Sequence, residues 1–148
     1  QGAIYVGGGN TKSALGVWRE WGADQVFAEA YAAGVLLAGV SVGAMCWFEA
    51  AITDSFWGAG YQPLRCLGLL AGGCAVHYSS EPRRRTRLHE ALATLAIDDQ
   101  AAELIEEGKA VRALSWAPGA GAYRVEWVHG QAREAAFAHV PLPPCCHC

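Results

Sequence analysis

The sequence predicts an α/β fold in which helices cover both faces of a parallel sheet. Three observations lead to this prediction. A short apolar run at residues 3–6 ends in a glycine cluster, a stretch with helical periodicity begins at residue 13, and an uninterrupted apolar run occupies residues 35–38. The order strand, helix, strand is typical of parallel sheets, whose crossover helices pack against the sheet faces. We therefore expect a right-handed crossover between the two apolar runs.

The N-terminal elements follow from local patterns. The run Ala3-Ile4-Tyr5-Val6 has β character and stops at Gly7-Gly8-Gly9-Asn10. From residue 13 onward the apolar side chains recur at helical spacing, with charged residues on the opposite side. A second helix, or the end of the first, is expected over residues 25–33, and Gly34 closes it.

The next strand belongs to a long stretch without charge, residues 31–48. Its length approaches that of a bilayer core. The stretch contains three glycines, however, and is bounded by Glu29 and Glu49 without a basic flank. It is therefore interpreted as a buried strand followed by a packed helix over residues 44–49, and no membrane association is expected.

The remainder of the chain alternates between loops and short elements. Residues 51–73 are rich in glycine and loop-like, with a short strand at residues 67–70. A β-type run at residues 75–78 precedes a helix that runs from Pro82 to Leu95. Residues 101–106 fit either a helix or a strand. Residues 109–116 and 123–128 alternate with period two, which predicts a C-terminal β-hairpin joined across residues 118–121.

Composition excludes several classes of protein. The 148 residues are 53% hydrophobic and 17% charged, with a formal net charge of −3. Intrinsic disorder is excluded, because such a chain has enough apolar surface to offset its ordering entropy. The sequence pI of 5.9 argues against a nucleic-acid partner. We expect one domain over residues 1–140, followed by a Pro/Cys-rich tail over residues 141–148.

The cysteines indicate neither a metal site nor a disulfide framework. Cys46, Cys66 and Cys74 have apolar or glycine-rich surroundings that suit small buried side chains. The tail ends Cys145-Cys146-His147-Cys148, without the spaced ligand pairs of zinc sites. A reducing, cytoplasmic location is therefore expected, and the sequence predicts no metal and no other cofactor.

The strongest chemical signal is Gly39-Val40-Ser41-Val42-Gly43, which lies between the apolar strand and a helical run. This context is that of a nucleophile elbow, in which a strained turn exposes a serine and the following N–H faces the developing oxyanion. The alternative is that the two glycines simply permit a tight turn. The glycine cluster after the first strand would lie at the same sheet edge, where its N–H groups could supply a second oxyanion donor.

A serine nucleophile needs a base and an orienting acid. Among the five histidines, His77 is the one at a strand end with loop on both sides. Three acids come into consideration as its partner: Glu49 beyond the elbow, Asp54 in the following loop, and Glu81 four residues after His77. The residues alone leave the choice among these acids open.

Taken in chain order, these segments resemble peptidase E, the aspartyl dipeptidase family related to cyanophycinase. The matching segments extend from Ala3 to about Glu134, and they are Ile4 to Thr11, Trp18 to Glu20, Ala38 to Ala44, Cys46 to Glu49, Thr53 to Ser55, Cys66 to Leu70, His77-Tyr78, Glu81-Pro82, Asp98-Asp99 and Ala122 to Glu126. The resemblance implies a class I glutamine amidotransferase-like sheet, with serine in place of the amidotransferase cysteine. It also implies a serine peptidase that removes an N-terminal Asp from dipeptides or short peptides.

The resemblance assigns roles to individual residues. The nucleophile falls on Ser41 and the base on His77. The acid falls on Asp54, with Glu49 as the alternative because the length of this loop varies. The oxyanion hole falls on the N–H groups of three further residues, Gly8, Gly9 and Val42. A preference for an acidic substrate residue would need a cation, for which Arg83, Arg84, Arg85 and Arg87 are candidates.

The chain also departs from the family pattern. Val42 replaces the usual alanine after the nucleophile, and Ala75-Val76 stands where a proline commonly precedes the histidine. Family members carry a further N-terminal stretch that supplies the first strands of the sheet, so the resemblance implies that these strands are missing here. An inactive family member and a general esterase or amidase are the alternatives to an Asp-specific peptidase. A small peptide is the expected partner, and an exposed sheet edge would favour a homodimer.

Overall fold

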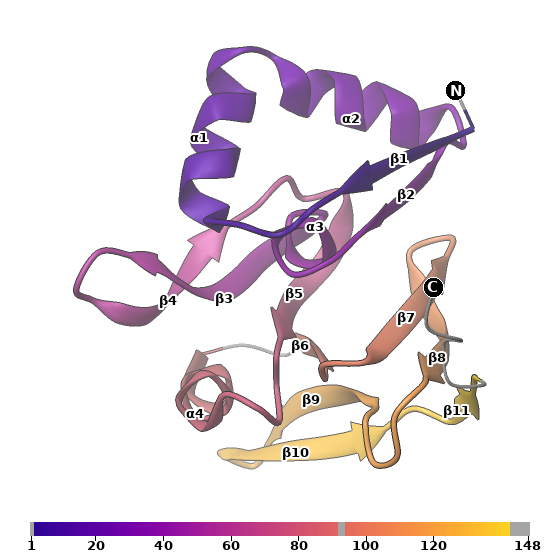
Figure 1. Ribbon diagram of the computed structural model, residues 1–148. Helices are drawn as coiled ribbons and strands as arrows, with labels where there is room; N and C mark the ends of the chain where they lie inside the picture. The colour runs from indigo at the N-terminus through magenta and orange to yellow at the C-terminus, as the bar shows by residue number, and fades with distance from the viewer. Residues whose placement is uncertain (1, 92–93, 143–148) are drawn as a thin grey trace. The chain divides into compact units, whose positions relative to one another are not determined.

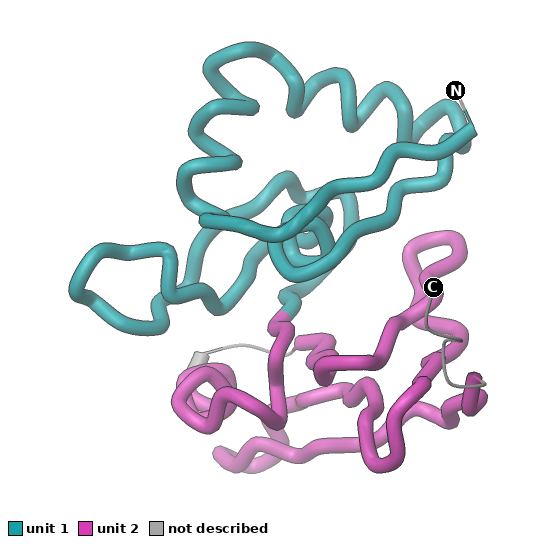
Figure 2. Tube along the Cα trace, in the orientation of Figure 1, with its two compact units in different colours: residues 1–74 teal, residues 75–148 magenta. Residues whose placement is uncertain are grey.

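The computed structural model describes residues 2–91 and 94–142, which contain eleven strands and four helices. The chain divides into two compact units, residues 1–74 and residues 75–148 (Figure 2). Each unit has its own buried side chains, and each is described by itself below.

Unit 1 begins with a strand, two helices and a parallel strand (Figure 1). These elements are β1 (Ala3–Val6), α1 (Thr11–Glu20), α2 (Ala23–Ala32) and β2 (Leu36–Gly39). Strands β1 and β2 pair in parallel from Ala3↔Leu36 to Val6↔Gly39. The side chain of Asn10 caps α1 by accepting the N–H of Ser13 at 2.9 Å. The predicted strand, helices and parallel strand are all present.

The rest of unit 1 is mainly strand. A four-residue helix, α3 (Val42–Met45), is followed by β3 (Phe48–Phe56), β4 (Gly60–Arg65) and β5 (Leu70–Val76), whose last residues lie in unit 2. Strand β3 pairs antiparallel with β4 on one side and parallel with β5 on the other. Positive φ angles at Gly58 and Gly60 allow the tight turn between β3 and β4.

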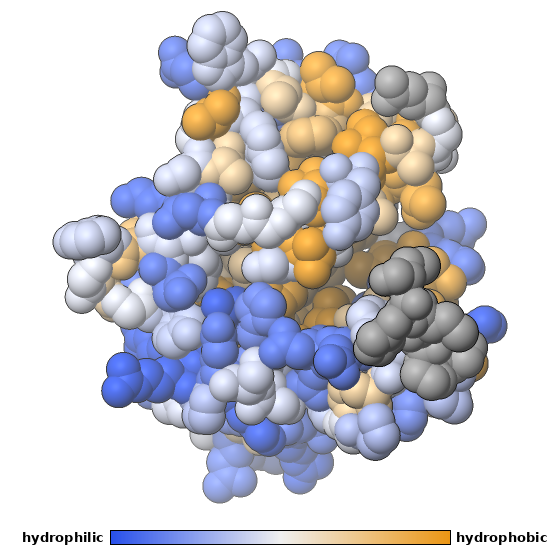
Figure 3. All heavy atoms as spheres, viewed as in Figure 1, coloured by the Kyte–Doolittle hydropathy of each residue, from blue (hydrophilic) through white to orange (hydrophobic). Residues whose placement is uncertain are grey.

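The buried side chains of unit 1 lie between its helices and β3. Leu15 of α1, Met45 of α3 and Ile52 of β3 are each at most 2% exposed. Phe27 makes edge-to-face contacts with Trp18 and Trp47, at centroid distances of 5.3 and 5.5 Å. Apolar side chains are also exposed on this unit, and they gather over α2, β1 and β2 in Figure 3, among them Val26 and Leu36.

Unit 2 contains one helix, α4 (Pro82–Ala91), and two groups of strands. The first group has the order β10 (Gln131–Ala136), β9 (Ala122–Val128), β6 (Thr94–Ile97), with antiparallel pairing throughout. The second has the order β11 (His139–Pro141), β8 (Lys109–Ser115), β7 (Ala101–Glu106), in which β7 and β8 are antiparallel and β8 and β11 parallel. Among its most deeply buried side chains are Tyr78, Leu88, Ala96, Ala113 and Val125.

The predicted fold class is wrong. The described residues form mixed sheets in which strands predominate, in place of a parallel sheet with helices on both faces. One cause is the segment after Ser41, where the expected helix ends at Met45 and β3 begins at Phe48. Strand β3 carries aromatic and β-branched residues, which fit a pleated, half-buried surface.

The C-terminal hairpin was also placed on the wrong strands. The strands at residues 109–116 and 123–128 exist as β8 and β9, but each pairs with a different neighbour. The hairpins are β7–β8 and β9–β10, closed by Glu107-Gly108 and His129-Gly130, all four residues with positive φ. Two-residue loops of this kind match the twist of the strands that they join. Residues 101–106, which fitted either element, form strand β7.

Candidate active site

Ser41 occupies a strained turn between β2 and α3. Its backbone has φ 55° and ψ −109°, a conformation that a non-glycine residue rarely adopts. Backbone hydrogen bonds hold the turn on both sides: the N–H of Val40 donates to Val6 at 3.1 Å and that of Met45 donates to Ser41 at 3.1 Å. The surrounding structure therefore imposes this conformation, which costs on the order of 1–3 kcal/mol. Strand β2 ends at Gly39 before the turn and α3 begins at Val42 after it, whereas the predicted helix over residues 44–49 is shorter than expected and gives way to β3.

The two flanking glycines are required by close backbone contacts. A Cβ atom on Gly43 would lie 2.0 Å from the carbonyl oxygen of Val6, and a Cβ atom on Gly39 would lie 2.5 Å from that of Gly43. Real Cβ atoms do not approach so closely, so no other residue fits at either position without a shift of the backbone. Strand β1 and the Ser41 turn are thereby brought into direct contact.

The glycine loop after β1 also lies beside Ser41. A Cβ atom on Gly8 would lie 3.4 Å from Cβ of Ser41 and 3.9 Å from its Oγ. Gly9 has φ 147° and open space around its Cβ position. Val42, the next residue after Ser41, is 1% exposed. Of the three predicted oxyanion residues, Gly8 and Val42 are thus placed next to Ser41.

Hydroxyl groups of β3 anchor the other end of this glycine loop. The N–H of Thr11 donates to Oγ of Ser55 at 2.8 Å, and the hydroxyls of Thr11 and Thr53 lie 3.2 Å apart. Thr53 and Ser55 are joined in turn by a 2.8 Å hydrogen bond. Because Thr11 and Thr53 are both 1% exposed, this network fixes the start of α1 against β3.

His77 directly follows β5 in unit 2, just past the strand that was expected over residues 75–78, and its side chain pairs with Asp99. Nδ1 of His77 contacts Oδ1 of Asp99, and the hydroxyl of Ser80 donates to Oδ2 of the same carboxylate. The side chains of His77 and Asp99 are 32% and 47% exposed. Like Ser41, His77 has φ 55°.

The electrostatics of the pair favour a charged Asp99. The hydrogen bond from Ser80 is the largest cause that holds the pKa of Asp99 below its ordinary value, and the contact with His77 acts in the same direction. A charged carboxylate only accepts hydrogen bonds, so it requires the hydrogen of His77 on Nδ1. In a neutral ring with that hydrogen, Nε2 is the acceptor, and this tautomer is the one that a general base needs.

The carboxylate beside His77 is therefore one that sequence reasoning did not select. Glu49 accepts the N–H of Gly72 at 2.8 Å within unit 1, and Asp54 is an exposed residue of β3. Glu81 forms an ion pair with Arg84 at 2.7 Å. The signal for Asp99 was present in the sequence, since two carboxylates directly follow the apolar run 95–97. The Asp98-Asp99 pair contributed to the family resemblance, but neither residue was considered as the acid.

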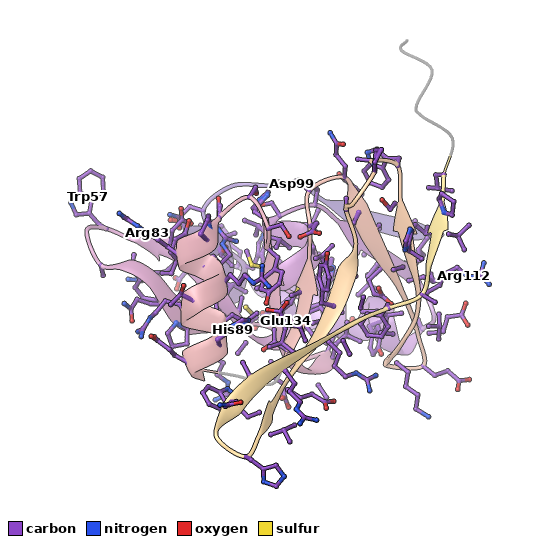
Figure 4. The ribbon with its side chains drawn as sticks, turned by 90° about the horizontal axis from the view of Figure 1, so that it is seen from below. Trp57, Arg83, His89, Asp99, Arg112 and Glu134 are labelled. Atoms are coloured by element: carbon purple, nitrogen blue, oxygen red, sulfur yellow. The ribbon has the colours of Figure 1, made fainter. Side chains whose placement is uncertain are left out.

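The four arginines proposed to bind an acidic substrate differ in their surroundings. Arg84 is 3% exposed and pairs with Glu81. Arg85 forms a two-pronged ion pair with Glu134, at 3.0 and 2.7 Å, and Arg87 pairs with Glu90 at 2.7 Å. Arg83 is exposed on α4 (Figure 4).

Two further observations concern cofactors and membranes. Within residues 2–91 and 94–142, no group of three or more His, Cys, Asp or Glu side chains could hold a metal ion. Cys145, Cys146, His147 and Cys148 lie outside the described residues. Across the described part of the chain, every helix is too short or too polar to cross a membrane.

Comparisons with known proteins identify the family. The model of peptidase family S51 matches residues 1–114, which is more than half of the chain. The chain is also 41% identical over 147 residues to the uncharacterized peptidase YgaJ of Bacillus subtilis (strain 168). That alignment covers 95% of this chain and 60% of the relative, so the chain spans about 60% of the length of the curated protein that it matches. The resemblance to peptidase E is thereby confirmed: the chain belongs to peptidase family S51.

Proposed function

We propose that this chain is the catalytic part of a serine peptidase that cleaves dipeptides or short peptides, with a preference for N-terminal Asp. The observation that carries the proposal is the strained Ser41 turn with the Gly8 backbone beside it, in a chain of a peptidase family. Strained residues persist where the surrounding structure holds them, and they cluster at active sites. The preference for Asp comes from the resemblance to aspartyl dipeptidases.

In the proposed reaction, Ser41 attacks the scissile carbonyl carbon while Nε2 of His77 takes the hydroxyl proton. The electron pair of the C=O bond moves to the carbonyl oxygen, where N–H groups of Gly8, Gly9 and Val42 would stabilise the negative charge. His77 then gives its proton to the leaving amine as the C–N bond breaks, which leaves an acyl-enzyme. Water, activated by the same histidine, hydrolyses the ester and restores Ser41.

We assign the orienting acid to Asp99. The contact between Asp99 and Nδ1 of His77 supports this assignment over Asp54 and Glu49, because an orienting acid acts through that nitrogen. Asp99 would hold the reactive tautomer and stabilise the imidazolium that forms when Nε2 accepts a proton.

For the acidic substrate side chain, Arg83 is the first candidate. The other three arginines already pair with carboxylates of unit 2, whereas Arg83 is an exposed residue of the same helix. A guanidinium can bind a carboxylate through two parallel hydrogen bonds, which favours aspartate over neutral residues.

The test is a comparison of dipeptide hydrolysis by the purified chain and its variants. Asp-Leu, Glu-Leu, Asn-Leu and Leu-Leu are compared as substrates, and released amine is measured. We expect Asp-Leu to be cleaved fastest, and Ser41→Ala to lose at least about a thousandfold in kcat, as removal of a nucleophile does. Ser13→Ala, on the exposed start of α1, is the matched control and should retain the wild-type rate. Equal rates for wild type and Ser41→Ala would refute the proposal.

A further inference from the structure

A buried carboxylate adjacent to Asp99 is the centre of a separate set of hydrogen bonds in unit 2. Asp98 is 7% exposed, and its two oxygens accept three hydrogen bonds. The N–H of Ser79 donates to Oδ1 at 3.0 Å, while the N–H of Gly121 and the hydroxyl of Tyr123 donate to Oδ2 at 3.0 and 3.1 Å. Asp98 therefore ties the turn after β5 to the start of β9.

The turn that Asp98 holds is the one that carries His77. Ser79 is two residues after His77, and in the same turn the N–H of Tyr78 donates to the carbonyl of Ile97 at 3.3 Å. Residues 97, 98 and 99 thus contact the turn one after another, and the last of these contacts is Asp99 with His77. The first two contacts thus restrain the backbone directly beside the final pair.

The backbone of this turn also needs external support. His77 has φ 55°, and Gln100, directly after the two carboxylates, has φ 60°. Non-glycine residues in this region cost on the order of 1–2 kcal/mol each, so the chain would relax to another conformation without restraints. Asp98 provides such restraints between the two strained residues, because charged acceptors form the stronger class of hydrogen bond.

We propose that Asp98 is a positioning residue, whose carboxylate holds the His77 turn so that Nδ1 of His77 meets Asp99. This inference rests on the proposed roles of His77 and Asp99, and it adds a residue with no direct part in the chemistry. Asp98 acts through the N–H of Ser79 on one side, and through Gly121 and Tyr123 on the other.

The substitution Asp98→Asn is the most direct test. An amide presents one oxygen and one NH₂ group in place of two oxygens. If the amide oxygen faces Gly121 and Tyr123, the NH₂ group faces the N–H of Ser79, so that two donors meet. If the amide is flipped, the NH₂ group faces the N–H of Gly121 with the same result. In either orientation a backbone N–H loses its acceptor, although the volume of the side chain is unchanged.

The readout is the proton on Nδ1 of His77, observed by NMR in protein labelled with ¹⁵N-histidine. His77→Gln identifies the signal by removing it. In the wild type, the contact with Asp99 should protect this proton from exchange with water. In Asp98→Asn we expect exchange to accelerate by at least about tenfold, the effect of losing one hydrogen bond of ordinary strength.

Two further variants separate positioning from stability. Glu134→Gln disturbs a different carboxylate in unit 2, which accepts from Tyr78 and pairs with Arg85 and His89 (Figure 4). It should lower the melting temperature but leave the His77 exchange rate within about twofold of wild type, because the three hydrogen bonds of Asp98 stay intact. Tyr123→Phe removes one donor to Asp98 and should accelerate exchange by about threefold. If Asp98→Asn fails to fold, Tyr123→Phe decides the question.

The inference is overturned if the His77 proton is unprotected in the wild type, or if Asp98→Asn, or Tyr123→Phe in its place, exchanges at the wild-type rate. It is also overturned if Glu134→Gln accelerates exchange as much as Asp98→Asn, because general loss of stability would then explain both. The readout does not require turnover. An inactive wild type with the expected exchange rates would refute the proposed function and keep the positioning role.

Discussion

Ser41 and His77 share the same unusual backbone angle, φ 55°, at the two positions where chemistry is proposed. Neither is a glycine, so both conformations are held by contacts elsewhere. For Ser41 these contacts depend on the absence of side chains at Gly39 and Gly43, and for His77 they depend on hydrogen bonds to residues 97–99. At the scale of single residues, the fold therefore holds two strained backbone conformations in two different ways: by close packing against glycines at Ser41, and by hydrogen bonds at His77.

The first prediction concerns Gly43. In Gly43→Ala the new methyl group would lie 2.0 Å from the carbonyl oxygen of Val6, so β1 and the Ser41 turn must separate. We expect a loss of at least about 3 kcal/mol in the free energy of unfolding, the range of severe overpacking. Gly16→Ala is the control, because that glycine lies in α1 with nothing near its Cβ position. It should stabilise the protein by about 0.5–1 kcal/mol. Urea denaturation measures both, and equal stabilities would contradict the geometry of the turn.

The second prediction concerns Ser80. Its hydrogen bond is the largest cause of the lowered pKa of Asp99, and it stabilises the charged carboxylate. Ser80→Ala should therefore raise the pKa of Asp99 toward the ordinary value. Because the proposed mechanism needs a charged Asp99, the acid limb of the activity profile should move to higher pH in the same variant. The pKa is measured by ¹³C NMR of the labelled carboxyl group, with Ser13→Ala as the control. A pKa that stays the same or falls would contradict the assignment.

At the scale of elements, β3 connects the glycine loop to the rest of unit 1. Its residues Thr53 and Ser55 hold the first turn of α1, while the start of the loop is held by the pairing of β1 with β2. The loop that carries Gly8 is thus fixed at both ends by different strands. A loop of glycines would otherwise be the most mobile part of the proposed site.

The third prediction follows from this arrangement. Thr53→Val keeps the shape of the side chain but removes the hydroxyl that contacts both Thr11 and Ser55. We expect a loss of about 1–3 kcal/mol in the free energy of unfolding, because buried polar groups lose a partner. The rate constant kcat should fall more than KM changes, since the loop would stabilise the transition state. Thr86→Val, at an exposed position of α4, is the matched control and should change stability by less than about 0.5 kcal/mol.

At the scale of the whole molecule, acid–base chemistry outside the site affects stability. Glu103 on β7 has buried carboxylate oxygens, and burial raises its pKa to about 7. The nearby backbone of Arg112 lowers the pKa and offsets only part of this effect. Between the ordinary value of 4.5 and about 7, the native state binds this proton more tightly than the unfolded state. Stability therefore falls as pH rises through this window.

The fourth prediction is that Glu103→Gln removes this pH dependence. Relative to the wild type, the variant should gain on the order of 1–3 kcal/mol of stability at about pH 8 compared with about pH 5. Glu106→Gln, at an exposed position of the same strand, is the control and should follow the wild type. Thermal unfolding as a function of pH measures the difference. A variant whose stability depends on pH as in the wild type would exclude Glu103 as the cause.

Sequence reasoning succeeded where a pattern was local. The β1–α1–α2–β2 segment and the turn at Ser41 were predicted from apolar runs, helical periodicity and flanking glycines. Sequence reasoning failed where the structure depends on which strands pair with each other. The period-two pattern of residues 109–116 and 123–128 predicts two strands but does not indicate which other strands they pair with. The His129-Gly130 and Glu107-Gly108 turns, which identify the true hairpins, were not used for this purpose.

The candidate site shows the same division. Ser41 and His77 stand out in the sequence by their places at strand ends, whereas the partner of His77 depends on a contact between residues 22 positions apart. Asp54 and Glu49 were chosen for their nearness to Ser41 in the sequence and from the family pattern. Asp99 was identified as the partner of His77 only from the structure, in which the end of β6 contacts the turn that carries His77.

The central claim is that Ser41 is an activated nucleophile, and a fluorophosphonate probe tests it most directly. Mass spectrometry after digestion identifies the labelled residue and the rate of labelling in wild type, Ser41→Ala, His77→Gln and Ser13→Ala. We predict a single label on Ser41 in the wild type and in Ser13→Ala, none in Ser41→Ala, and labelling at least about a hundredfold slower in His77→Gln, as loss of a general base implies. A label on another residue, or a wild-type Ser41 that reacts no faster than in His77→Gln, would contradict the claim.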